Sequence, residues 1–367
     1  MEIDDTLRTE LMDAFCDLVT EAETRIASLL EQEDDETMHS LFRAIHNIKG
    51  NAGLMQLTPI VDFTHEIEEV AGALRRKQFS ISPTIAETLL IALDRLHDLH
   101  QSELFGTQFD YLCIDELKVL YGAMSKATRE EADGIALQTL QFLGAGVVSA
   151  DIDIFSKTET PQLSFSVPLQ NLDQQQQVLR DLSFFHELSL QLDKQLPHWH
   201  ERSLQLFDWA MKMNKIAGSP IPKDQLAAAT YLHDLGLSFV ERDQWTQSWA
   251  PQPDTALYQH PNWAYQILIR IPGWEDAATI ILHHHERING TGYPSGLQGN
   301  DIHPGAKILA ILDSFFLLTN GRVDASARKS TVRAVSAINA RLDTHFEGLW
   351  VQCFNHMIRT ELRSGKV

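Results

Sequence analysis

The sequence predicts a mainly all-α protein: an N-terminal four-helix bundle, a small connector and a C-terminal all-helical domain. Apolar residues recur every three to four positions through the first hundred residues and again after Asp181, which is the period of an amphipathic helix. Prolines fall between these stretches, where helices end. The length of 367 residues suits two or three domains better than one core.

Four helical stretches account for the N-terminal bundle. The second runs from about Glu36 to Leu57, the third begins near Ile60, and the fourth runs from about Thr84 to Leu99. Short connections between such stretches predict antiparallel packing over residues 1–105. The apolar stripe of the first stretch consists of Ile3, Leu7, Leu11, Phe15, Leu18, Ala22, Ile26 and Leu29.

Residues 106–182 carry a weaker pattern, and we interpret them as a connector. Residues 116–124 and 129–143 have helical spacing, and Gly144-Ala145-Gly146 interrupts it. Residues 151–155 and 163–167 alternate apolar with polar side chains, which favours a small β-hairpin. The helical pattern then continues through residues 183–367.

Composition narrows the class of function. The chain has 50 acidic against 30 basic residues, a formal charge of −20 that disfavours nucleic acid as a partner. It has no apolar run of membrane-spanning length, and its acidic N-terminus is unlike a signal peptide. Three widely separated cysteines favour reduced thiols. We therefore expect a cytoplasmic protein with no membrane or nucleic-acid partner.

A histidine in the second helical stretch has unusual neighbours. Helical spacing places His46, Lys49 and Gly50 on one face, opposite an expected core stripe that includes Ile45 and Leu54. Glycines inside a helix cost about 1 kcal/mol each relative to alanine. A bare surface would let another protein approach the imidazole, and the lysine would balance a phosphoryl group on the ring.

The pattern His-x-x-Lys-Gly-x-x-Gly, formed by His46, Lys49, Gly50 and Gly53, resembles the histidine-containing phosphotransfer (Hpt) domain of phosphorelays. The resemblance covers about residues 1–105. It implies that His46 accepts a phosphoryl group from the receiver domain of a response regulator or hybrid histidine kinase.

The C-terminal half is rich in imidazoles: nine of the 16 histidines lie between His186 and His303. With nearby aspartates and no cysteine, they suit a divalent metal such as Fe or Mn. Asp313 lies in a nearly all-apolar helix, where a carboxylate needs a compensating cation or metal. Taken singly, each residue could be an ordinary buried polar group. The candidate ligands are His200, His233, Asp234, His260, His284, His285 and Asp313.

These residues and the segment Gly292-Tyr293-Pro294 resemble the HD-GYP domain of bacterial signalling phosphodiesterases over about residues 183–365. The resemblance implies a pair of divalent ions and hydrolysis of cyclic di-GMP to pGpG or GMP. One ion would be held by His200, His233, Asp234 and Asp313, and the other by Asp234, His260, His284 and His285. Arg322 matches a substrate-phosphate contact, and Arg287 and Tyr293 belong to the signature loop.

Several positions depart from the HD-GYP pattern. Leu237 stands where a phosphate-binding lysine is usual, Phe316 replaces an aspartate, and Asn289 replaces an acidic residue. Leu196 stands where members with a third metal carry glutamate. The leading expectation is a cyclic-di-GMP phosphodiesterase regulated through His46. The alternative is an adaptor that binds metal, nucleotide or a partner without turnover while the Hpt domain relays phosphate.

Overall fold

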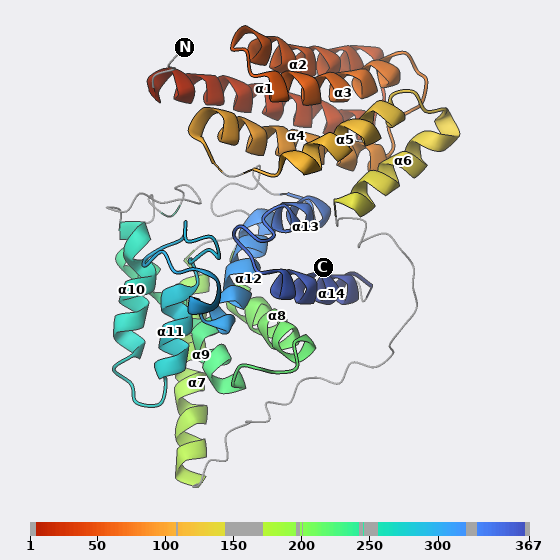
Figure 1. Cartoon of the computed structure of the whole chain (residues 1–367). Coiled ribbons are helices and arrows are strands. Elements are labelled where there is room, and N and C mark those ends of the chain that lie inside the picture. Colours follow the sequence, from red (N-terminus) through yellow and green to blue (C-terminus); the bar gives the residue numbers. More distant parts are fainter. Residues whose placement is uncertain are drawn as a thin grey trace. The chain divides into compact units, whose positions relative to one another are not determined.

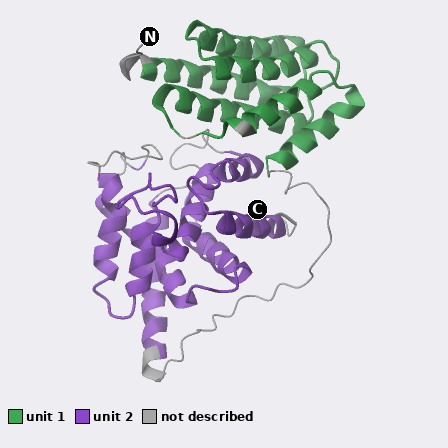
Figure 2. Cartoon of the chain, viewed as in Figure 1, with its two compact units in different colours: residues 1–149 green, residues 150–367 purple. Residues whose placement is uncertain are grey.

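The computed structural model divides the chain into two compact units, Met1–Ser149 and Ala150–Val367 (Figure 2). The described part of the chain is helical, as predicted, and contains no β-strand. The expected hairpin at residues 151–155 and 163–167 lies outside it. The structure describes residues 5–107, 109–143, 172–195, 199, 201–241, 245, 256–320 and 329–363.

The first unit begins with the predicted four-helix bundle (Figure 1). Consecutive helices pack against one another, and α1 also packs against α4. Side-chain caps set two of the starts: Asp34 accepts the Thr37 N–H, and Ser82 accepts the Ile85 N–H before Pro83. The four helices are α1 (Asp5–Glu31), α2 (Asp35–Leu54), α3 (Thr58–Arg75) and α4 (Pro83–Phe105).

Two further helices, α5 (Tyr111–Met124) and α6 (Arg129–Phe142), extend this unit. α5 packs against α3, and α6 packs against α4. The buried Tyr121 hydroxyl donates a hydrogen bond of 2.6 Å to the Thr88 carbonyl of α4. Part of the segment that the sequence suggested as a connector therefore belongs to the first compact unit.

The second unit is a helical domain built around α12 (Pro304–Asn320), whose apolar face is almost wholly buried. Helices α8, α11, α13 and α14 pack against it, and α9 bridges α7, α8 and α11. Among the described residues, no helix combines the length and the apolar character needed to cross a bilayer. The other helices are α7 (Leu172–Asp193), α8 (Arg202–Ile216), α9 (Lys223–Leu232), α10 (Ala256–Leu268), α11 (Glu275–His283), α13 (Thr331–Asn339) and α14 (Gly348–Arg363).

Candidate functional sites

The first site lies on α2 and α3, around His46. The side chain of His46 is 58% exposed, and its Nδ1 lies 2.9 Å from Oε1 of Glu68. Lys49, one turn further along α2, forms an ion pair with the other oxygen of the same carboxylate. The exposed imidazole and its lysine neighbour are as predicted from the sequence, whereas Glu68 was not anticipated.

Glu68 fixes the chemical state of the imidazole. Burial raises the pKa of this carboxyl, but hydrogen bonds from Lys49 and His46 outweigh burial and lower it below its ordinary value. An ionised carboxylate accepts hydrogen bonds but donates none, so Nδ1 of His46 carries the proton. The lone pair of the neutral ring then lies on Nε2. A nucleophilic nitrogen on an exposed ring suits attack on a phosphorus atom.

The surface beside His46 is open, as the glycines suggested. A Cβ atom added at Gly50 would meet nothing within 4 Å, and one at Gly53 would only touch Val61 at 4.0 Å. One expectation is wrong: Leu54 is 83% exposed, because α2 ends there and the core stripe stops at Ala52. This end of α2 thus presents little bulk except an exposed leucine.

Phe42 borders the imidazole on its N-terminal side. The two rings are nearly parallel, with centroids 6.2 Å apart. The guanidinium of Arg75 lies 3.8 Å above the Phe42 ring, which makes a cation–π contact between α2 and α3. The surface next to the His46 imidazole on this side is therefore the aromatic ring of Phe42, held by Arg75.

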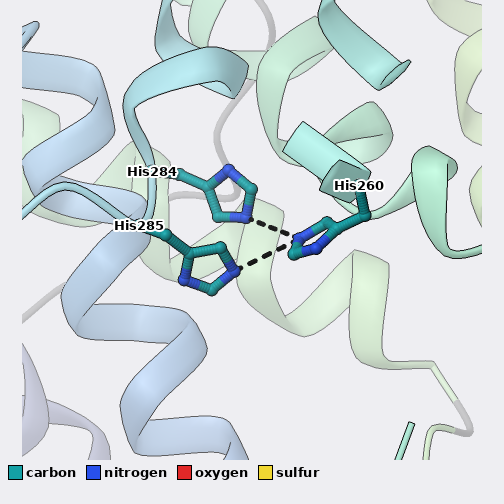
Figure 3. Close-up of side chains that lie close together, drawn as sticks. All are labelled: His260, His284 and His285. Carbon is teal, nitrogen blue, oxygen red and sulfur yellow. Dashed lines mark hydrogen bonds between the residues drawn. The ribbon is translucent and has the colours of Figure 1, made fainter. Parts of the chain in front are cut away.

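The second site lies in the HD-like half and begins with three histidines (Figure 3). His260 comes from α10, and His284 and His285 directly follow α11. The Nε2 atoms of His284 and His285 lie 3.4 and 3.2 Å from Nε2 of His260. These three side chains could together hold one metal ion.

Backbone carbonyls orient two of these rings. Nδ1 of His260 donates to the Leu257 carbonyl, and Nδ1 of His284 donates to the Ile281 carbonyl, each at 2.6 Å. Because a carbonyl only accepts, each Nε2 presents a lone pair in the neutral ring. Burial and the neighbouring imidazoles lower the pKa of His284 well below its ordinary value. A neutral imidazole with its lone pair on Nε2 is the form that ligates metals here. A divalent ion therefore fits the group.

A second cluster joins His233, Asp234 and Asp313, whose ligand atoms lie within 4.8 Å of one another. His233 and Asp234 follow the end of α9, and Asp313 is in the middle of α12. Asp234 links the two clusters, since its Oδ1 is 3.4 Å from Nε2 of His260 and its Oδ2 is 3.4 Å from Nε2 of His233. Six of the predicted ligands are therefore brought together.

This second cluster already surrounds a side-chain cation. Nη2 of Arg202 lies 2.6 Å from Oδ1 of Asp313, 2.8 Å from Oδ2 of Asp234 and 3.1 Å from Nε2 of His233. The sequence required a cation or metal near Asp313, and the structure supplies the cation. A metal ion at the same point would overlap the guanidinium, so this cluster does not fit the expected ion.

The Gly-Tyr-Pro loop packs against one of the three histidines, His285. The Tyr293 ring stacks on His285, with centroids 4.7 Å apart, and also on Tyr258. The buried Glu286 carboxylate accepts the N–H groups of Ser295 and Leu297 and so fastens the loop. Sequence reasoning missed this role of Glu286, although an acid directly after two candidate ligands was visible.

Two glycines permit close backbone approach at the site. A Cβ at Gly292 would lie 2.3 Å from the Arg287 nitrogen, and one at Gly236 would lie 2.0 Å from the His260 carbonyl oxygen. Gly236 therefore lets α10 bring His260 close to the His233-Asp234 turn. These two positions admit no side chain.

The remaining predicted residues divide into two groups. His200 and Arg322 lie outside the described residues, so their roles as ligand and phosphate contact stay predictions. Arg287 is in the loop, where Nη1 lies 3.5 Å from the Thr291 hydroxyl. Leu237 is buried in the hydrophobic core of the domain and supplies no charge to the site.

Comparison with known proteins finds two separate domains in the chain, one in each compact unit. Residues 10–99 match the sequence model of the Hpt domain, and residues 188–348 match that of the HD domain. The chain is therefore an N-terminal Hpt domain fused to a C-terminal HD domain. An Hpt domain joined to an HD domain is an arrangement typical of phosphorelay signalling, and HD domains typically bind divalent metal.

Individual relatives match parts of the chain. The chemotaxis protein CheA of Cereibacter sphaeroides is 34% identical over 146 residues, which is 40% of this chain and 20% of that protein. CheA of Borreliella burgdorferi is 32% identical over 104 residues, which is 27% of this chain and 12% of that protein. The cyclic di-GMP phosphodiesterase response regulator RpfG of Xanthomonas campestris pv. campestris is 38% identical over 68 residues, 18% of each chain. The chain spans no more than a fifth of these relatives' lengths.

Proposed function

We propose that this protein is a cytoplasmic bacterial phosphorelay component in which phosphorylation of His46 regulates a metal-dependent cyclic-di-GMP phosphodiesterase. The observation that carries the enzymatic part is the set of three imidazoles beside Asp234, with the Tyr293 ring stacked on one of them, His285. The similarity of a segment of the chain to RpfG, named a cyclic di-GMP phosphodiesterase, supports this choice of substrate.

In the phosphotransfer step, Nε2 of His46 attacks the phosphorus of an aspartyl phosphate on a receiver domain. The P–N bond forms as the P–O bond to the aspartyl carboxylate breaks, and the electron pair of that bond leaves with the carboxylate. The ring becomes cationic, and Glu68 stabilises it through the Nδ1 proton that it already accepts. Lys49 is placed to balance the charge of the arriving phosphoryl group.

In the HD domain, His260, His284, His285 and Asp234 would hold a divalent ion, with Fe or Mn as the best candidates for this nitrogen and oxygen set. Such an ion supplies Lewis-acid polarisation of a phosphoryl oxygen and lowers the pKa of a water molecule. Tyr293 restricts one side of the imidazole cluster through its stack on His285. Gly292 and Glu286 keep that loop in place.

The test is turnover by purified full-length protein, loaded anaerobically with Fe²⁺ or Mn²⁺ and given cyclic di-GMP. Appearance of pGpG or GMP, lost in His284→Ala, supports the phosphodiesterase. Intact substrate after incubation with protein that retains its metal would contradict it. A second comparison, between His46-phosphorylated and unphosphorylated protein, tests the regulation.

The burial of Leu237 favours one alternative, a signalling adaptor that binds metal or nucleotide without hydrolysis. The position usual for a phosphate-binding lysine is filled here by a core residue, which removes a charge-assisted contact of roughly 1.5–3 kcal/mol. Calorimetric binding of cyclic di-GMP without product formation would identify the adaptor.

A further inference from the structure

We propose that the guanidinium of Arg202 permanently takes the place of one of the two expected divalent ions, so that the HD domain holds a single ion on His260, His284 and His285. This inference rests on the metal-binding role proposed above for the three-histidine group. It assigns Arg202 a structural role that the sequence pattern did not indicate.

A single nitrogen of Arg202 contacts all three groups of the second cluster. Nη2 is 2.6 Å from Asp313, 2.8 Å from Asp234 and 3.1 Å from His233. Nδ1 of His233 donates to the Thr230 carbonyl, so its Nε2 is the acceptor of the Arg202 N–H. One ligand atom of each residue in that cluster is thus already bonded to the same positive charge.

The local fold holds Arg202 in this position. The residue is 2% exposed and begins α8, directly after Glu201 in the left-handed backbone region. The Asp193 carboxylate accepts both the N–H and the hydroxyl of Ser203, at 2.9 and 2.6 Å, which anchors the first turn of α8. The side chain therefore enters the cluster from a fixed backbone.

Two aromatic rings enclose the guanidinium. Its central carbon lies 4.3 Å from the Trp199 ring centroid and 5.4 Å from the Phe316 ring centroid. Both contacts are in the cation–π range. Phe316 replaces an aspartate of the HD-GYP pattern, and its ring here lies against the Arg202 guanidinium.

The charge balance also favours one ion. Asp234 and Asp313 carry two negative charges, and Arg202, which stays protonated in proteins, cancels one of them. One divalent ion beside Asp234 leaves a small positive excess that substrate phosphate can balance. A second ion would have to displace a buried guanidinium from its carboxylates and leave it unpaired, which is strongly unfavourable.

The chemical consequence concerns the nucleophile. A pair of ions activates a water molecule held between them, and a guanidinium does not coordinate water in this way. His233 and Asp313 serve to hold Arg202, and any hydrolysis by this domain depends on one ion. The cyclic-di-GMP hydrolysis proposed above would then take place at a mononuclear centre.

Metal stoichiometry tests the proposal independently of turnover. Full-length protein is loaded anaerobically with Mn²⁺, desalted and measured by elemental analysis and electron paramagnetic resonance. We expect one Mn per chain and the six-line spectrum of an isolated ion. Two Mn per chain, or the spectrum of a spin-coupled pair, would overturn the proposal, and no bound Mn would overturn both it and the metal-binding role.

Variants separate the two clusters. Asp313→Asn should retain one Mn per chain, whereas His284→Ala should lose it; loss of metal from folded Asp313→Asn would refute the assignment. Arg202→Met should raise the ratio above one if it folds, with the exposed Arg270→Met as control. The wild-type ratio decides the question even if Arg202→Met does not fold.

Discussion

Replacing Glu68 by glutamine tests the assignment of the nucleophile most sharply. Glutamine keeps the shape of the side chain but removes the negative charge that faces Nδ1 of His46 at 2.9 Å. A unit charge pair at this distance interacts by about 6 kcal/mol at an effective dielectric constant near 20. Because the His46 side chain is 58% exposed, water screens this attraction, and the loss should be the roughly 1.5–3 kcal/mol typical of a hydrogen bond to a charged group.

That free energy corresponds to a reduction of about 10- to 150-fold in the rate at which His46 is phosphorylated, since the cationic ring develops during attack. Potassium phosphoramidate is a suitable donor because it requires no partner protein, and phosphorus-31 NMR follows the product. Nitrogen-15 NMR of the ring should show Nδ1 protonated in the wild type and a mixture of tautomers in Glu68→Gln.

Glu69→Gln on the same helix is the matched control and should react at the wild-type rate. A folded Glu68→Gln protein that is phosphorylated as fast as the wild type, with an unchanged tautomer, would refute the argument that Glu68 positions and charges the imidazole. His46→Gln should abolish phosphorylation by phosphoramidate.

Three further predictions concern the two units. Gly236→Ala should lower the free energy of unfolding of the HD domain by at least about 2 kcal/mol in denaturant unfolding, because its Cβ would meet the His260 carbonyl. Gly134→Ala in α6, where the added Cβ meets open space, should stabilise the first unit by about 0.5–1 kcal/mol. Equal effects of the two substitutions would contradict the packing argument. Burial lowers the pKa of His100 to about 4, below the roughly 6.5 of an unfolded chain, so this group contributes stability that is full above pH 6.5 and falls as the pH drops toward 4. Stability should therefore decrease by about 2 kcal/mol between pH 7.5 and 5 through His100, and a His100→Leu variant that keeps the same pH dependence would refute this. Gly292→Ala should displace the Tyr293 loop and lower cyclic-di-GMP turnover by tenfold or more with metal content unchanged, and loss of the metal instead would show that the loop also supports the ligands.

The sequence predicted the helices well because their information is local. The apolar stripes and the caps before α2 and α4 lie within a few residues of the turns that they specify. The exposed Leu54 was predicted to be buried, because helical spacing alone does not show that the core stripe ends two residues earlier, at Ala52. The pairing of α5 and α6 with α3 and α4 depends on contacts between distant segments, which periodicity does not contain.

The candidate sites divide in the same way. Imidazoles and carboxylates at family spacing were sufficient to identify six candidate ligands, and the structure brings their side chains together. Glu68 and Arg202 were missed because each acts across helices, and their own surroundings in the sequence contain no motif. The useful signal for Arg202 was indirect: a carboxylate in an apolar helix, Asp313, required a positive charge, but the sequence did not distinguish an arginine from a metal ion.

The central claim is that His260 of α10 coordinates a divalent ion together with His284 and His285, which directly follow α11. X-ray absorption spectroscopy of Zn²⁺-loaded full-length protein tests it most directly. We predict a first shell of nitrogen and oxygen atoms at about 2.0–2.2 Å, with the outer-shell scattering of three imidazoles that is reduced in His284→Ala. A shell of oxygen atoms alone, without imidazole scattering, would contradict it.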